Sequence, residues 1–87
     1  MKPGDLVRIL PEGIWDGYRV LWEEPITIDN DTKGLPYIRF FIDDVGTILE
    51  QKEVLDGYGS SLSLTTWVRI LCSTGIGWIM RGEIKPV

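Results

Sequence analysis

The side chains that could carry chemistry are unevenly represented, because the 87 residues include 13 carboxylates and no histidine. Without an imidazole, the chain lacks the usual base of Ser-His and Cys-His nucleophile pairs and the commonest ligand of transition metals. An enzyme would have to rely on carboxylates or lysine alone. The densest acidic pairs are Glu23-Glu24 and Asp43-Asp44, and sequence neighbours in a strand point to opposite faces, where they cannot share a proton. The sequence therefore predicts no catalytic residue and no enzymatic activity.

The segment 29–34 has the outline of a calcium loop, with oxygen-bearing side chains at its first and third positions and glycine at its sixth. Lys33 occupies a ligand position, however, and Phe40 stands where the bidentate glutamate is required. Asp, Asn and Gly also tolerate the backbone conformations of tight turns. We therefore expect a hairpin tip at 29–34, with no metal, and the sequence indicates no other cofactor and no small-molecule substrate.

Four tryptophans and three tyrosines are many for so small a chain, so some of these rings should be at least partly exposed. Exposed Trp and Tyr rings anchor interfaces, because they supply a large contact area with little loss of rotamer entropy. We expect an interaction patch made by Trp15, Tyr18, Trp67, Arg69 and Trp78. The competing interpretation is core packing, in which Trp22 and Trp78 close the two ends of the fold.

The charge of the chain is divided between an acidic middle and basic ends, with a formal total of −4. Residues 11–56 contain most of the Asp and Glu, whereas Lys and Arg predominate outside this range. An acidic middle repels phosphate, which disfavours nucleic acid as a partner. The alternative function is nonetheless that of a nucleic-acid-associated accessory protein, which would stack single-stranded bases on Trp67 and bind phosphates through Arg8, Arg69 and Arg81.

The elements that must position these residues are short strands, because ten glycines and five prolines punctuate the chain and no apolar pattern keeps a helical spacing. We expect strands at 5–10, 18–22, 26–28, 37–42, 45–50, 62–72, 77–80 and 85–87, and one helical turn at 81–84. The strands 26–28 and 37–42 would form a hairpin around 29–34, and 56–61 would be a loop. Gly46 would mark a bulge or a close backbone approach.

The segment 62–72 has the clearest alternation in the chain. One face carries Leu62, Leu64, Val68, Ile70 and Cys72, and the other carries Ser63, Thr65, Trp67 and Arg69. We expect the first face to point into the core and the second to point outward. The lone Cys72 would then be a small buried hydrophobe, which suits a reducing compartment.

The size of the chain suits one domain over residues 1–87. Several short strands in so small a chain can hide one apolar face only by curling into a barrel or by packing as two orthogonal sheets. No stretch approaches the roughly 18 apolar residues of a membrane span, and the chain does not open with an apolar signal core. We expect a soluble cytoplasmic or virion-associated protein that does not contact a membrane.

Three segments resemble SH3-like proteins. Residues 67–84 resemble the closing half of an SH3 domain, in which an aromatic strand leads through a glycine-tipped hairpin to a Gly-aromatic-aliphatic strand and a 3₁₀ turn. Residues 2–9 and 45–50 resemble the Gly-Asp and Gly-Thr strands of bacterial and phage SH3-like barrels, including small proteins of tailed phages and marine viruses. The resemblance implies an all-β, SH3-like barrel of five to seven short antiparallel strands, with an inserted hairpin and one 3₁₀ turn near the C-terminus.

The resemblance does not extend to the SH3 groove for proline-rich peptides. Trp67 matches the tryptophan of that groove, but Met80 and Glu83 stand where its proline and tyrosine would be. Recognition of a proline-rich helix needs several parallel aromatic walls, so that activity is not implied. We expect a non-enzymatic protein-protein interaction or assembly module, whose exposed edges at 85–87 and in the 26–42 hairpin could add strands of a partner or of a second copy.

Overall fold

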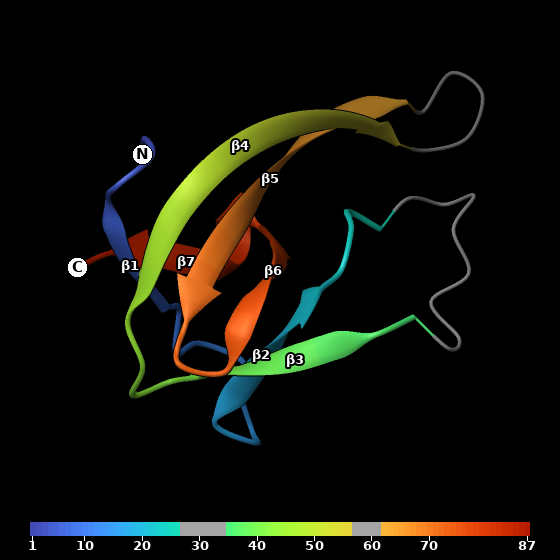
Figure 1. Ribbon diagram of the computed structural model, residues 1–87. Coiled ribbons are helices and arrows are strands. Elements are labelled where there is room, and N and C mark those ends of the chain that lie inside the picture. Colours follow the sequence, from blue (N-terminus) through green and yellow to red (C-terminus); the bar gives the residue numbers. More distant parts are fainter. Residues whose placement is uncertain (27–34, 57–61) are drawn as a thin grey trace.

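The computed structural model describes residues 1–26, 35–56 and 62–87, which form seven antiparallel strands and one 3₁₀ turn (Figure 1). The strands are β1 (Leu6–Ile9), β2 (Tyr18–Trp22), β3 (Tyr37–Phe41), β4 (Gly46–Asp56), β5 (Ser63–Cys72), β6 (Gly75–Met80) and β7 (Ile84–Pro86). The 3₁₀ turn, η2, spans Arg81–Glu83 between β6 and β7. The expected all-β class, with one 3₁₀ turn near the C-terminus, is confirmed. No helix among these described residues is long and apolar enough to cross a membrane.

The strands form one sheet in the order β3-β2-β6-β5-β4-β1-β7. Its edge strands are β3 and β7, and no ladder joins them among the described residues, so the sheet is not closed there. Exposed edges were expected at 85–87 and in the 26–42 hairpin, and these two segments contain β7 and β3. Pro86 is in the edge strand β7, as expected, because proline cannot donate a hydrogen bond to a central ladder. The sheet curls through β4 and β5, which form a long arched hairpin (Figure 1).

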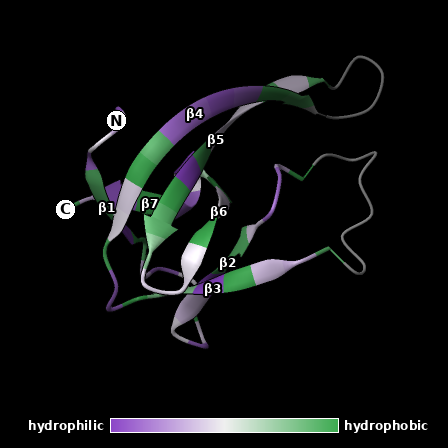
Figure 2. Ribbon diagram, viewed as in Figure 1, coloured by the Kyte–Doolittle hydropathy of each residue, from purple (hydrophilic) through white to green (hydrophobic). Residues whose placement is uncertain are grey.

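The strand β4 is longer than expected and continues to Asp56, into the segment predicted to be a loop. Its pairing with β5 shifts between Ile48 and Glu50, which is the signature of a bulge. The expectation at Gly46 is confirmed as a close approach, because a Cβ atom there would collide with the side chain of Ile70. Figure 2 shows the hydrophilic middle of β4, where four polar residues follow one another and the alternation is lost.

The strand β3 pairs with β2 along five residue pairs, from Tyr18↔Phe41 to Trp22↔Tyr37. The sequence instead assigned 26–28 as its partner, but Ile26 lies outside any strand. The rest of that predicted strand, the predicted tip at 29–34 and residues 57–61 of the loop predicted at 56–61 lie outside the described residues.

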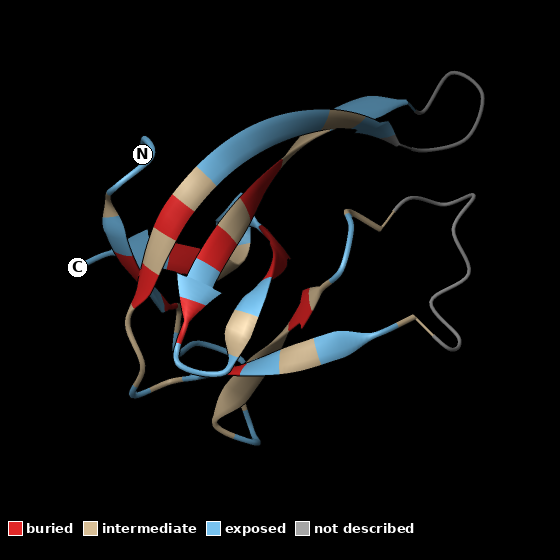
Figure 3. Cartoon of the chain, in the orientation of Figure 1, coloured by how far each residue is buried: buried red, intermediate tan, exposed pale blue. Residues whose placement is uncertain are grey.

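The main core lies on the inner face of the curled sheet. It consists of Val7, Ile9, Leu21, Phe40, Ile48, Val68, Ile70, Cys72, Ile79 and Ile84. These side chains come from every strand. In β5 they alternate at Val68, Ile70 and Cys72 as predicted, and the free thiol of Cys72 is buried. Figure 3 shows that buried positions occur in the proximal parts of β4 and β5, whereas the distal part of the β4–β5 hairpin is mostly exposed.

Two expectations about the 62–72 strand are wrong. Leu64 belongs to the predicted inner face but is 64% exposed, because β4 and β5 extend beyond the core. Trp67 belongs to the predicted outer face but is only 5% exposed, and Trp78 is 9% exposed. The register places Trp67 opposite Met80 and Trp78 opposite Arg69, on the face that does not carry Val68. Trp67 and Trp78 are therefore buried on this face, outside the main core.

Candidate interaction surface

The outer face of the β2–β3 hairpin carries three cross-strand pairs. They are Tyr18↔Phe41, Val20↔Arg39 and Trp22↔Tyr37. The intervening residues Leu21 and Phe40 point the other way and are in the core. We call the six residues of the three pairs the β2–β3 outer face. It presents a surface of aromatic rings around one arginine.

The aromatic rings of this face contact one another edge to face. The ring centroids of Tyr18 and Phe41 are 6.1 Å apart at 64°, and those of Trp22 and Tyr37 are 5.7 Å apart at 62°. The guanidinium carbon of Arg39 lies 4.9 Å from the centroid of Tyr18, which is a cation–π distance. Tyr37 and Phe41 are nevertheless 52% and 43% exposed. The hairpin therefore holds its rings in fixed positions while leaving area free for a contact.

The backbone of β3 also presents unused hydrogen-bonding groups. The N–H of Ile42 donates to the carbonyl oxygen of Gly17 at 2.9 Å, so Gly17 and Ile42 form a hydrogen-bonded pair. Along an antiparallel ladder, hydrogen-bonded pairs alternate with pairs whose backbone groups point away from each other. The backbone groups of Ile38 and Phe40 consequently face β2, and those of Tyr37, Arg39 and Phe41 face the open edge. An open hollow of about 460 Å³ follows this edge and is lined by Tyr37, Ile38, Arg39, Phe41 and Thr74.

Two of the edge carbonyl groups already have a donor. The hydroxyl of Thr74, in the turn between β5 and β6, donates to the carbonyl oxygen of Arg39. The N–H of Asp44 donates to the carbonyl oxygen of Phe41 at 2.9 Å. The N–H groups of the edge residues are therefore its most available groups, although a carbonyl oxygen can accept a second hydrogen bond.

The carboxylate of Asp44 fastens the end of this hairpin to the central strands. Its Oδ2 accepts hydrogen bonds from the N–H (2.9 Å) and the hydroxyl of Ser73, and its Oδ1 accepts one from the N–H of Val45. These bonds, above all the one from the Ser73 hydroxyl, favour the ionised form and lower the pKa of Asp44. One member of the Asp43-Asp44 pair thus has a structural role.

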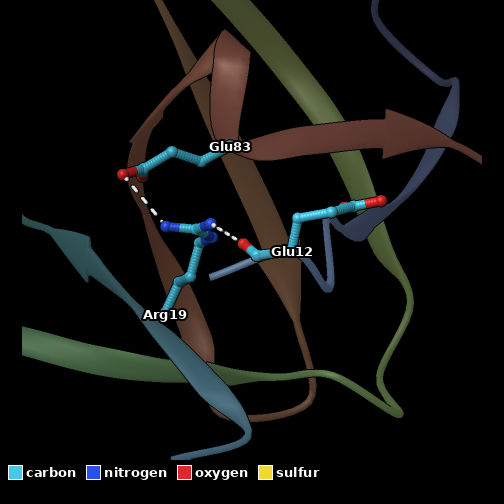
Figure 4. A network of polar contacts seen from close by, with 3 residues as sticks. All are labelled: Glu12, Arg19 and Glu83. Carbon is cyan, nitrogen blue, oxygen red and sulfur yellow. Dashed lines mark hydrogen bonds and ion pairs between the residues drawn. The ribbon is translucent and has the colours of Figure 1, made fainter. Parts of the chain in front are cut away.

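A second fastening joins β2 to the C-terminal segment (Figure 4). The Nη1 of Arg19 lies 3.3 Å from Oε1 of Glu83 in η2, and its Nη2 donates to the carbonyl oxygen of Glu12 at 3.3 Å. The buried Nε of Arg19 has no hydrogen-bond partner. Burial raises the pKa of Glu83, and the positive charge of Arg19 opposes this shift. The geometry is that of an ion pair which holds three segments together.

Acidic and metal-ligating side chains are not clustered among the described residues. No group of three or more His, Cys, Asp and Glu side chains among them could hold one metal ion. The larger hollow of about 730 Å³, near Met1, Leu64, Met80 and Ile84, contains a single carboxylate, that of Glu83. That carboxylate is paired with Arg19, so no second acid lies beside it in this hollow.

The five residues predicted to form a patch occupy different environments. Trp15 is 95% exposed in the connection before β2, and Tyr18 is half-buried on the β2–β3 outer face. Arg69 is half-buried opposite Trp78 on β5 and β6. Trp67 and Trp78 are buried, so they offer little area to a partner. A contact through Trp15, Tyr18 and Arg69 stays a prediction.

The sequence reasoning did not single out the most exposed rings of the hairpin, Tyr37 and Phe41, nor the arginine between them. The signal was present as an alternation, because Tyr37, Arg39 and Phe41 are separated by apolar residues that point to the core. No family model, curated protein or solved structure matches the chain in comparisons with known proteins. Its function is therefore argued from its own residues.

Proposed function

We propose that the chain is a non-enzymatic protein-interaction module that binds through the β2–β3 outer face and the adjoining edge of β3. The supporting observation is the pair of exposed rings, Tyr37 and Phe41, on either side of Arg39 on an edge strand. Aromatic and arginine side chains are the commonest energetic anchors of protein interfaces. A protein partner and a second copy of the chain both suit such a surface.

An SH3-like barrel is part of the same proposal. The succession of a long strand, a hairpin with Gly75 at a φ of 141°, a 3₁₀ turn and a short last strand supports it. A hydrogen bond from the Thr74 hydroxyl to the carbonyl oxygen of Arg39 links the β5–β6 turn to the edge strand β3, which supports a strong curl of the sheet. The relationship to small bacterial and phage proteins rests on the resemblance of residues 2–9 and 45–50.

A protein partner is favoured over nucleic acid by the position of Trp67. The nucleic-acid alternative needs an exposed ring on which a base can stack, and Trp67 is buried. Arg8, Arg69 and Arg81 come from β1, β5 and η2, and only Arg69 is on the same strand as Trp67. The net charge of −4 further opposes the binding of phosphate.

The test is a screen of a random peptide library against the purified chain, followed by affinity measurements on the recovered peptides. The double substitution Tyr37→Ser and Phe41→Ser removes both exposed rings. We expect it to weaken binding by about tenfold or more, because buried aromatic anchors dominate interface energies. The matched control is Leu55→Ser with Leu64→Ser, which removes two exposed apolar side chains from the distal β4–β5 hairpin and should leave the affinity unchanged.

Circular dichroism melts of both double variants establish that they are folded, and light scattering across concentrations identifies a second copy as the partner. The proposed surface is contradicted if the two double variants lose affinity equally. It is also contradicted if the screen recovers no peptide and the chain does not self-associate. Binding of a single-stranded oligonucleotide that weakens steeply with salt would support the nucleic-acid alternative.

A further inference from the structure

The β3 edge has the donor pattern that an additional strand requires. The N–H groups of Tyr37, Arg39 and Phe41 face away from β2, and they are spaced every second residue along an extended strand. An antiparallel neighbour would offer carbonyl groups with the same spacing. Every strand pair in the described sheet is antiparallel, so the same pattern would continue outward.

The other edge of the sheet is poorly suited to the same role. The strand β7 has three residues, and one of them is Pro86, which lacks an N–H. Short edge strands that contain proline are a common protection against strand addition. The strand β3 has five residues and no proline within its bounds, so it is the more open of the two edges.

The side chains of β3 specify what the added strand should carry. Arg39 has no carboxylate partner, because Arg19–Glu83 is the only salt bridge among the described residues. Residues directly opposite each other in a ladder share a face, and a pair of opposite charges or of apolar side chains stabilises the pairing. A complementary strand therefore has a carboxylate opposite Arg39 and an apolar side chain opposite each of Tyr37 and Phe41.

A second copy of β3 satisfies this pattern less well. Antiparallel pairing of two β3 strands along their full length would place Arg39 directly opposite its own counterpart. Like charges in directly opposite positions destabilise a sheet. A strand with an acidic centre avoids this repulsion and uses the unpaired charge of Arg39.

We propose that β3 binds an extended peptide of a partner protein as an eighth, antiparallel strand, with the pattern apolar-x-acidic-x-apolar. This inference rests on the protein-interaction function proposed above and names the class of its partner. The aromatic rings of the β2–β3 outer face bind the two apolar side chains, Arg39 binds the carboxylate, and the edge N–H groups bind the peptide carbonyls.

The probe is the capped peptide Thr-Ile-Thr-Glu-Thr-Val-Thr, titrated into the full chain and followed by NMR. We expect slowed hydrogen exchange at the amides of Tyr37, Arg39 and Phe41, with no comparable change at Ile38 and Phe40, which already face β2. A peptide with lysine in place of glutamate should bind about two- to fivefold more weakly, as expected for one cross-strand charge pair. Arg39→Glu should reverse this preference.

Backbone methylation separates strand addition from a contact through side chains alone. N-methylation of the peptide glutamate removes an N–H that faces β3 and should weaken binding by about tenfold or more. N-methylation of a neighbouring threonine alters an N–H that faces away, so it is the matched control and should change the affinity little. Protection of the three edge amides together with this difference supports the inference.

The inference is overturned if N-methylation weakens binding only at the threonine, weakens it equally at both positions, or weakens it at neither position. A different outcome is that the peptide binds in a way that Tyr37→Ser with Phe41→Ser abolishes but that neither methylation changes. Strand addition then fails, while the protein-interaction function stands. Two further results also overturn the inference. One is a dimer of the free chain that Arg39→Glu abolishes, and the other is no binding of the peptide at 1 mM, which corresponds to about 4 kcal/mol of binding free energy. The library screen then decides the function separately.

Discussion

Two groups of aromatic residues lie on one face of the sheet but differ in exposure. Trp67 and Trp78 are on the central strands β5 and β6 and are buried, whereas Tyr37 and Phe41 are on the edge strand β3 and are exposed. A central strand has neighbours on both sides, whose side chains cover its rings, and an edge strand has a neighbour on one side only. For these four rings, exposure follows the position of the strand in the sheet and not the type of residue.

The substitution Trp67→Ala is expected to have the largest effect, because it empties a buried position on a central strand. We expect a loss of about 3 kcal/mol or more in the free energy of unfolding, measured by urea denaturation. The matched substitution Tyr37→Ala, on the edge strand, should cost about 1 kcal/mol, chiefly through its ring contact with Trp22. Similar costs at the two positions would contradict the distinction between central and edge rings.

The substitution Gly77→Ala tests the junction between the two regions. A Cβ atom at Gly77, on β6, would lie 2.6 Å from the Cβ of Leu21 and 3.1 Å from its backbone carbon, on β2. The backbone cannot give way as a flexible side chain can, so we expect a loss of about 1 to 3 kcal/mol in the free energy of unfolding.

Gly82→Ala is the control for this substitution, because a Cβ atom there would meet nothing within 4 Å. Thermal and urea unfolding of the two variants give the comparison. A cost at Gly77 no greater than that at Gly82 would mean that β2 and β6 can separate freely, and that the hairpin is not held closely against the central strands.

The two carboxylates that fasten the hairpin should give opposite dependences of stability on pH. Burial raises the pKa of Glu83 above its ordinary value of 4.5, so the folded state holds its proton more tightly than the unfolded state. The contribution of Glu83 is therefore fully present below pH 4.5 and is lost as the pH rises through the raised pKa. We expect wild type to lose stability relative to Glu83→Gln over this window, measured by urea unfolding at a series of pH values.

Asp44 provides the internal comparison, because its pKa is lowered from 3.8 by the hydrogen bonds from Ser73. Its contribution to stability is present above pH 3.8 and is lost as the pH falls through the lowered pKa. Wild type should therefore lose stability relative to Asp44→Asn as the pH falls, whereas it loses stability relative to Glu83→Gln as the pH rises. The same sign for both substitutions would mean that the attraction between Arg19 and the ionised Glu83 outweighs the burial of the Glu83 carboxylate.

Much of the fold could be predicted from local patterns, whereas the exposure of its rings could not. The alternation in β5 identified the core positions of Val68, Ile70 and Cys72, and Pro86 identified an edge. The burial of Trp67 depends on which strands flank β5, and that order is set by pairings between residues far apart in the sequence. The length of β4 was missed because its polar middle, which extends beyond the core, does not alternate.

The candidate surface was missed for the same reason. Tyr37, Arg39 and Phe41 could be assigned to a strand from their sequence, and the 26–42 hairpin to an edge of the sheet. The predicted pairing with 26–28, in place of β2, left open which strand of that hairpin has the free edge. Arg19 and Glu83 are 64 positions apart, and nothing in their local sequence indicates that they form an ion pair.

The smallest expected effect is at Thr74, whose hydroxyl donates to the carbonyl oxygen of Arg39 on the β3 edge. Thr74→Val removes this donor with little change of volume and leaves the carbonyl free to accept a hydrogen bond from an added strand. We expect the affinity for the glutamate peptide to rise by about two- to threefold, since one hydrogen bond contributes only about 0.5 to 1.5 kcal/mol net. Ser73→Ala, at the neighbouring position of the same turn, should not raise it, because the Ser73 hydroxyl donates to Asp44 instead. An unchanged affinity with Thr74→Val would mean that the Thr74 hydroxyl does not compete with an added strand for the Arg39 carbonyl, which can accept a second hydrogen bond.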